Sequence, residues 1–425
     1  MGQYWVYVVD NPQRDLTSLC WWAFESDFHK GDKICLLPKD EVRAEYFSVQ
    51  KPDVIVWNYA RRNNIKAIKV AHELGIMNII HDTEGIPHDL STYFNGITEN
   101  DLKFIDQIWC WGVNQALFLQ ERFININNIL NLIITGSIRY EYAKSIPKIK
   151  FTNNLDKLIW NTSFCTISPR FQSAWREFTQ HHEYLELSSE ETLDKFIKFA
   201  SDRQSSAEYV RILLLYSKCL NITLRPHPFE SDSYYLNSFK DFTSKVKFST
   251  SGDINIDLSN HSLVIQYGCQ TALDSFIRGI PSVKPCRDNI NLWSKVTPYV
   301  DPITLCEKIS DIDYLQEILD LQKDLFAKHN INKFLYNIDQ PFLLNESNNF
   351  TSDIRKLPFK AKEINHEIKY LTVNVKSFLK KLLRLQQSDG QSRSLKSSDI
   401  KEFMEYNYKN KDWQFRYGKC ILKRK

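Results

Sequence analysis

Short apolar segments recur along the first third of the chain, separated by amphipathic segments of helical length. This alternation is typical of parallel strands joined by crossover helices. Between two of these segments, Ile65–Leu74 has helical spacing and stops at Gly75, where a left-handed helix terminator is expected. The pattern predicts one doubly wound domain over residues 1–145, with strands at Trp5–Val9, Lys33–Leu37, Val54–Trp57, Met77–Ile80, Gln107–Trp111 and Leu132–Thr135.

A second series of short apolar runs begins after a polar and basic stretch near residues 140–155. It predicts a second α/β domain over residues 146–345, in which a long helical crossover runs roughly from Glu183 to Cys219. Residues 346–385 have apolar side chains at helical spacing among lysines and arginines and predict a helical extension, and residues 386–425 predict a linker and basic tail. The expected strands of the second domain are Leu158–Trp160, Ile222–Leu224, Val246–Phe248, Leu263–Gln266 and Ser282–Val283.

Composition agrees with two large domains in 425 residues, because ~100–200 residues per domain is usual. A formal charge of +4 gives the protein no strong overall positive potential, so nucleic acid is not expected as a partner. The nine cysteines are scattered and form no C-x-x-C pair, which favours reduced thiols and a cytoplasmic location. No signal-peptide pattern and no run of 18 apolar residues occurs. The basic segment near Lys380 is either a solvated packing helix or a peripheral contact with the inner membrane, and the linker also suits further synthase domains in the same polypeptide.

Ligands of doubly wound sheets bind beyond the carboxyl ends of the strands, so the residues after each run are the candidates for chemistry. The most informative loop is Arg225-Pro226-His227-Pro228-Phe229-Glu230-Ser231-Asp232, which follows Ile222–Leu224. Its prolines restrict the backbone around His227. Its arginine, histidine and carboxylates combine anion binding with a nucleophile or acid. A structural histidine is the alternative.

Three more loops at strand ends have side chains that could bind a substrate or act as a base. His81-Asp82-Thr83-Glu84-Gly85 offers a general base for a substrate hydroxyl, or is simply a turn. The hydroxyl-rich Asn161-Thr162-Ser163, with Arg170 shortly after it, suits a phosphate or sugar, or is an ordinary polar loop. Gly268-Cys269-Gln270-Thr271 leads a strand into a helix and suits a phosphate, or is an ordinary strand-to-helix turn.

Other chemistries are disfavoured. The acid pairs Asp311/Asp313 and Asp253/Asp257 lie where turns and helix starts are expected, and no zinc-ligand spacing occurs. No G-x-G-x-x-G, Walker loop or G-x-S-x-G elbow is present, which argues against NAD enzymes, NTPases and α/β-hydrolases. We therefore expect no metal and no cofactor.

The loops together resemble a known family. Asp82-Thr83-Glu84-Gly85 and His227-Pro228 look like the acid-acid-glycine and His-Pro motifs of bacterial sialyltransferases and the related Kdo transferases, and Gly268–Ala272 resembles their phosphate-binding turn. The chain is most similar to the retaining β-Kdo transferases that form the N-terminal module of some O-antigen synthases. Over residues 1–345 the resemblance implies two Rossmann-like domains facing across a cleft, the GT-B type. Thr83 stands where the pattern has an acid, and Cys269-Gln270 replaces a Ser-Ser pair.

The resemblance also implies roles. The donor would be CMP-β-Kdo and the acceptor a lipopolysaccharide O-antigen or related glycan. His227 would donate to the donor phosphate, Thr271 and nearby amides would hold it, and Asp232 would be the nucleophile of a retaining double displacement. Glu84 would be the base, with Asp82 as the alternative. Arg225, Arg170 and Lys284 are the candidates for binding the Kdo carboxylate. An inverting sialyltransferase-like enzyme and a non-catalytic glycan-binding module are the competing interpretations.

Overall fold

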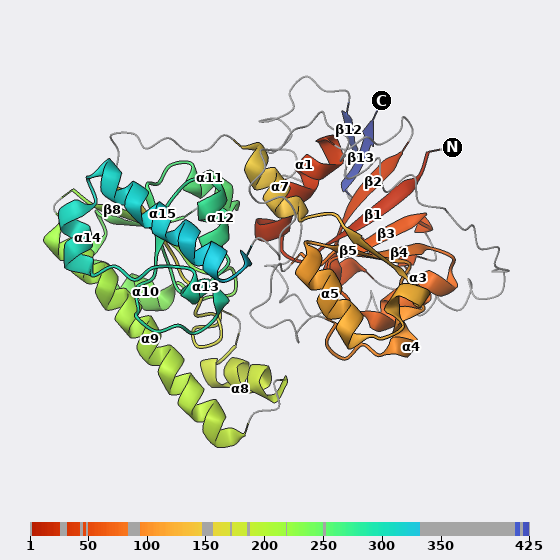
Figure 1. Cartoon of the computed structure of the whole chain (residues 1–425), viewed down its shortest axis with the longest axis horizontal. Helices are drawn as coiled ribbons and strands as arrows, with labels where there is room; N and C mark the ends of the chain where they lie inside the picture. The colour runs from red at the N-terminus through yellow and green to blue at the C-terminus, as the bar shows by residue number, and fades with distance from the viewer. Residues whose placement is uncertain are drawn as a thin grey trace. The chain divides into compact units, whose positions relative to one another are not determined.

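The computed structural model describes residues 2–25, 32–42, 46–47, 50–83, 94–146, 156–170, 172–184, 188–217, 219–249, 252–331, 413–416 and 420–424. The chain divides into two compact units, one of Met1–Ser145 with Asn332–Lys425 and one of Ile146–Ile331. Each unit is built on its own β-sheet (Figure 1).

The sheet of the first unit contains six parallel strands in the order β2-β1-β3-β4-β5-β6. Each lies within one residue of its predicted bounds. Burial on both faces of the sheet explains the apolar runs of β1 to β5, whereas the edge strand β6 is partly exposed. The strands are β1 (Tyr4–Val9), β2 (Lys33–Pro38), β3 (Val54–Trp57), β4 (Met77–Ile80), β5 (Gln107–Cys110) and β6 (Asn131–Ile134).

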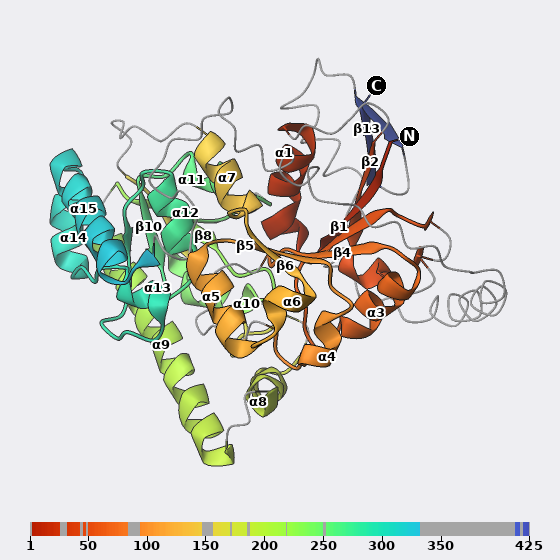
Figure 2. The same cartoon turned by 45° about the vertical axis from the view of Figure 1, so that its right-hand side comes forward.

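Helices cover both faces of this sheet, as Figure 2 shows. On one face Trp5, Tyr7 and Val9 pack with α1 (Thr17–Glu25) and α7 (Ile138–Ser145). On the other face Val6 and Val8 pack in a core shared with further helices. The alternation along β1 follows from the two-residue period of a strand. These helices include α3 (Ile65–Glu73), α4 (Glu99–Leu102), α5 (Val113–Arg122) and α6 (Ile126–Ile129).

The end of α3 confirms the expected terminator. Gly75 has φ +76°, in the left-handed region that favours glycine. The amide of Ile76 donates to the carbonyl of Ala71 at 3.0 Å, and that of Gly75 donates to the carbonyl of His72 at 2.9 Å. These bonds satisfy carbonyls that the helix end leaves without intrahelical partners.

The end of the chain departs from prediction. Instead of a basic tail, β12 (Trp413–Arg416) and β13 (Cys420–Arg424) form an antiparallel pair, and β13 also pairs antiparallel with β2. The apolar triplet Cys420-Ile421-Leu422 suits a strand, and its backbone satisfies the groups that β2 would otherwise leave unpaired. The predicted helical extension over residues 346–385 and the linker before residue 413 lie outside the described residues.

The second unit contains the five predicted strands, all parallel, in the order β11-β10-β7-β8-β9. Because β7 lies between β8 and β10, the loops that follow these three strands leave the same edge of the sheet side by side. The strands are β7 (Lys157–Asn161), β8 (Asn221–Arg225), β9 (Val246–Phe248), β10 (Leu263–Gln266) and β11 (Ser282–Val283).

The predicted helical crossover between β7 and β8 corresponds to the 28-residue α9 (Ser189–Tyr216), and a further helix, α8 (Ala174–Tyr184), precedes it. Ser188 and Glu191 form a capping box at the start of α9. One sheet face packs against α9, α10 (Ser233–Ser238), α14 (Pro302–Lys308) and α15 (Ile312–Lys328), and the other packs against α11 (Ile254–Leu258). In the part of the chain that the structure describes, no helix is long and apolar enough to cross a membrane.

Candidate functional site

Asn161 connects two of the strand ends in the second unit. Its Nδ2 donates to Thr271 Oγ1 at 2.6 Å and to Cys269 Sγ at 3.4 Å. Thr271 begins α12 (Thr271–Ile277), which follows β10. Two residues selected from separate loops of the sequence are thus in direct contact, and together they present an amide and a hydroxyl at the edge of the sheet.

The turn before α12 depends on Gly268. Its φ is +52°, its carbonyl accepts a hydrogen bond from Asn291 Nδ2 at 2.8 Å, and the next amide, of Cys269, donates to Gln266 Oε1 at 2.7 Å. Gln270 occupies the N-cap position of α12. The turn is therefore held on both sides of its glycine by side-chain amides.

Replacing Gly268 by alanine is expected to destabilise the protein by about 1–3 kcal/mol, because left-handed φ is unfavourable for alanine. The new Cβ would also lie 2.9 Å from Asn291 Nδ2. Urea unfolding provides the measurement. Gly252→Ala is the matched control, since nothing lies within 4 Å of a Cβ there, and it should change the free energy of unfolding little. Equal effects of the two variants would contradict the strained turn.

A buried carboxylate, that of Glu230, connects the loops after β7 and β8 by hydrogen bonds, and we call this set of contacts the Glu230 brace. Glu230 is 0% exposed. Its Oε2 accepts hydrogen bonds from Thr162 Oγ1 at 2.6 Å, from the amide of Phe164 at 3.2 Å and from the amide of His227 at 3.3 Å, and its Oε1 accepts from the hydroxyl of Tyr235 at 2.5 Å. Burial raises the pKa of Glu230, and these four hydrogen bonds oppose that rise.

This brace changes the interpretation of the loop after β7. Thr162, selected from the sequence as a ligand-binding residue, donates its hydroxyl hydrogen to Glu230 and is 1% exposed. The half-buried Ser163 is the neighbouring hydroxyl. Sequence analysis gave Glu230 no role of its own, although its place between His227 and Asp232 was a usable signal.

The imidazole of His227 is held in one tautomer. The amide of Phe229 donates to Nδ1 at 3.3 Å, so Nδ1 carries a lone pair and the neutral ring has its proton on Nε2. Pro228 lies between the two residues and keeps the turn tight. A half-buried imidazole with an Nε2–H can donate a hydrogen bond to a phosphate oxygen.

Asp232, at the N-cap position of α10, pairs with Arg170. The guanidinium NH2 of Arg170 lies 3.0 Å from Asp232 Oδ1, and the side chains of Arg170 and Asp232 are 41% and 44% exposed. Arg170 is also fixed to the brace, since its Nε donates to the carbonyl of Glu230 at 3.2 Å. The structure thus places a solvent-accessible carboxylate and a guanidinium together, five residues beyond His227.

The other two candidate cations are engaged elsewhere. Arg225 forms an ion pair with Asp257 and donates to the carbonyl of Gly252 at 3.2 Å. Lys284 is 7% exposed and donates to Asn289 Oδ1 and to the carbonyl of Ser294. Burial lowers the pKa of Lys284. Arg170 is the most exposed of the three.

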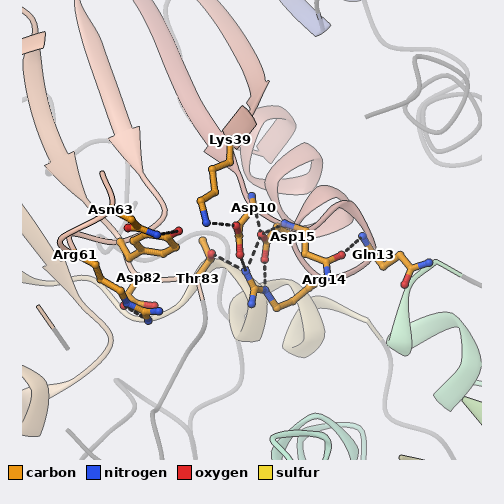
Figure 3. A network of polar contacts seen from close by, with 11 residues as sticks. Asp10, Gln13, Arg14, Asp15, Lys39, Arg61, Asn63, Asp82 and Thr83 are labelled. Atoms are coloured by element: carbon orange, nitrogen blue, oxygen red, sulfur yellow. Dashed lines mark hydrogen bonds and ion pairs between the residues drawn. The ribbon is translucent and has the colours of Figure 1, made fainter. Parts of the chain in front are cut away.

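The first unit has a charged network at the carboxyl end of its own sheet (Figure 3). Arg14 contacts Asp10 at 3.2 Å, Asp15 at 2.7 Å and Thr83 Oγ1 at 3.3 Å, and Lys39 contacts Asp10 at 3.0 Å. Sequence analysis missed the residues of this network after β1. The signal was available, because they follow the first apolar run just as the chosen loops follow theirs.

Asp82 lies at the side of this network, where it faces Arg61. The guanidinium NH2 of Arg61 is 3.8 Å from Asp82 Oδ2 (Figure 3). The central carbon of the same guanidinium lies over the ring of Tyr59, 4.5 Å from its centroid. The side chain of Asp82 is only 4% exposed. The predicted base Glu84 and its neighbour Gly85 lie outside the described residues.

His81, which follows β4, is fully buried and neutral. Its Nδ1 lies 2.5 Å from the hydroxyl of Tyr7, and its Nε2 lies 3.3 Å from the carbonyl of Gly136. A carbonyl only accepts, so Nε2 carries the proton and Tyr7 donates to Nδ1. Burial lowers the pKa of His81 to about 4.

The stability of the protein should therefore fall in acid. Unfolded His81 takes up a proton below about pH 6.5, whereas folded His81 resists protonation until about pH 4. Between these values we expect His81 to lower the free energy of unfolding by about 3 kcal/mol. Urea unfolding at pH 7 and pH 4.5 measures the loss, and His81→Gln should show a smaller one. A variant with the same pH dependence as the unmodified protein would contradict the assignment.

Comparisons with known proteins bear on the fold. No protein-family model and no curated protein matches the sequence. The UDP-GlcNAc 2-epimerase from Neisseria meningitidis bound to UDP-GlcNAc has a TM-score of 0.50 and 9% identity, over 84% of this chain and 99% of that chain. A wall teichoic acid polymerase TagF variant has a TM-score of 0.46 and 10% identity, over 84% of this chain and 89% of that chain. A putative UDP-N-acetylglucosamine 2-epimerase from Listeria monocytogenes has a TM-score of 0.46 and 10% identity, over 78% and 95%.

The first of these similarities and the parallel strands at the centre of both sheets together identify an α/β fold of the GT-B type with two Rossmann-like domains. Identity this low bears on the fold alone. The predicted fold class is confirmed at that level.

Proposed function

We propose that this chain is a glycosyltransferase that transfers Kdo from CMP-β-Kdo to a lipopolysaccharide O-antigen or a related surface glycan, with retention of configuration. The observation that carries the proposal is the loop after β8, in which the amide of His227 is bound to the buried Glu230 and Asp232 pairs with Arg170. His227 presents an Nε2–H, and Asp232 presents an accessible carboxylate beside Arg170. A GT-B fold provides the setting in which such a loop acts on a nucleotide sugar.

The first half of the reaction uses the second domain. The Asp232 carboxylate attacks the anomeric carbon of Kdo, and the bond from that carbon to the phosphate oxygen breaks. His227 donates from Nε2 to the departing phosphate, and the Asn161–Thr271 pair lies at the adjacent strand end to contact the same group. CMP leaves, and the sugar is attached to Asp232 with inverted configuration.

Arg170 suits the carboxylate of the sugar. In Kdo the carboxylate is attached directly to the anomeric carbon, so a cation that binds it must lie next to the nucleophile. Arg170 does so, at 3.0 Å from Asp232, whereas Arg225 is paired with Asp257 and Lys284 is buried. The bidentate geometry of a guanidinium matches a carboxylate.

The second half restores the configuration. An acceptor hydroxyl attacks the anomeric carbon, the bond to Asp232 breaks, and a base takes the hydroxyl proton. Glu84 is the proposed base and Asp82 the alternative. Two inversions give net retention.

The test is incubation with CMP-Kdo and deacylated O-antigen fragments, in the presence of EDTA, with CMP release and product stereochemistry as readouts. A β-linked product formed without metal is expected. An α-linked product would favour the inverting mechanism. Turnover of UDP-GlcNAc or CMP-sialic acid, with none of CMP-Kdo, would overturn the assignment of the donor.

A further inference from the structure

A small cavity opens at the carboxyl edge of the first sheet. Its volume of about 10 Å³ is close to what one water molecule or one hydroxyl group occupies. This edge is where open parallel sheets bind their ligands. Its walls come from β1, from the segment of residues 15–19 and from the residues after β4, β5 and β6, and include Tyr7, His81, Thr83, Trp111, Ser137 and Arg139.

Two hydrogen-bond donors in the wall have no acceptor among the described residues. They are the indole Nε1–H of Trp111 and the hydroxyl of Ser137, whose side chains are 1% and 2% exposed. Leaving a buried donor unsatisfied costs about 1–3 kcal/mol. An indole N–H only donates, so the missing group is an oxygen that accepts hydrogen bonds.

The size of the cavity favours a hydroxyl group. A volume of about 10 Å³ admits one oxygen atom, so a carboxylate or a phosphate would not fit inside it. Two other polar side chains of the wall are already engaged: both nitrogens of His81 are engaged by Tyr7 and Gly136, and Asp15 is ion-paired with Arg14.

The rim of the cavity is held by hydrogen bonds and ion pairs. Asp15 and Thr83, which line it, also belong to the network in Figure 3, where Arg14 holds both of them. The amides of Asp10 and Asn11 donate to Asp15 Oδ2 at 3.3 and 3.0 Å. A preorganised rim reduces the entropy that a bound ligand must lose.

We propose that this cavity receives one hydroxyl group of the acceptor sugar, whose oxygen accepts hydrogen bonds from Trp111 Nε1 and Ser137 Oγ. The inference rests on the proposed function, and it makes Trp111 and Ser137 residues that position the acceptor. Under this proposal the CMP-sugar is still bound by the second domain.

Ser137→Ala and Trp111→Phe each remove one hydrogen-bond donor from the wall of the cavity. We expect each to raise the KM for the O-antigen fragment about 3- to 10-fold, the effect of one hydrogen bond. CMP release from CMP-Kdo without acceptor should be unchanged. Ser145→Ala is the matched control, because that hydroxyl donates to the carbonyl of Tyr142 on an exposed part of α7, and it should leave KM unaltered.

A binding experiment is independent of turnover. Saturation-transfer NMR with a panel of methyl hexopyranosides should show contact with the full chain and a loss of signal in Ser137→Val, whose extra methyl groups fill the cavity. Thermal unfolding checks that each variant is folded. Unchanged signal in folded Ser137→Val would mean that the cavity holds an ordered water only. Absence of CMP release in the unmodified protein would instead refute the proposed function, and the binding result would still decide the subsite.

Discussion

Replacing Asp232 by asparagine is expected to reduce Kdo transfer by about 1000-fold or more, because an amide oxygen is a poor nucleophile and the covalent intermediate cannot form. Intact mass measurement of the unmodified protein with CMP-Kdo should show a sugar adduct, and the variant should show none. The fold should survive, since an exposed ion pair such as Arg170–Asp232 contributes at most about 1 kcal/mol.

The matched control is Asp241→Asn, an exposed acid in the same domain, which should retain full activity. Transfer by Asp232→Asn within a few-fold of the unmodified protein would exclude Asp232 as the nucleophile. Inversion at the anomeric carbon would then be expected, with the base as the only essential carboxylate.

Replacing Glu230 by glutamine should have the largest effect on stability. Its carboxylate accepts four hydrogen bonds in a fully buried position, and glutamine would replace one of the two acceptor oxygens by an NH2 group that faces a donor. We expect a loss of about 2–4 kcal/mol in the free energy of unfolding. Thermal unfolding should shift down by about 2–4 °C per kcal/mol.

Two control variants distinguish the loss of the hydrogen bonds to Glu230 from the general effect of removing a negative charge. Tyr235→Phe removes one donor and should lose about 1 kcal/mol. Glu208→Gln changes a 60% exposed acid on α9 and should lose almost nothing. If Glu230→Gln were as stable as Glu208→Gln, Glu230 would not brace the loops. Because the amide of His227 belongs to the same brace, transfer activity should fall with stability in this series.

The fold was predictable because its signals are local. Each of the eleven parallel strands is a short apolar run, and burial on both sheet faces explains such runs without reference to distant residues. The end of α3 at Gly75 is equally local, since only the backbone of one turn is involved. The missed strand β13 depends on a distant partner, β2, and its sequence is also rich in lysine and arginine.

The candidate site was predictable as a set of loops and less so as individual roles. The strand-end rule selected Asn161 and Thr271, which are in contact. It gave no means to foresee that Thr162 donates to Glu230, or that Arg225 pairs with Asp257, because both pairings join residues far apart in sequence. A charged residue alone does not reveal whether its partner will be the protein or a ligand.

The pairing of β13 with β2 has a consequence for biosynthesis. The first domain acquires its outer strands only when residues 413–424 have been made, long after β2. At about 5–20 residues per second, a ribosome leaves the edge of β2 open for tens of seconds. Open strand edges invite pairing with other chains. The nascent protein therefore passes through a period in which a chaperone at this edge would protect it from aggregation.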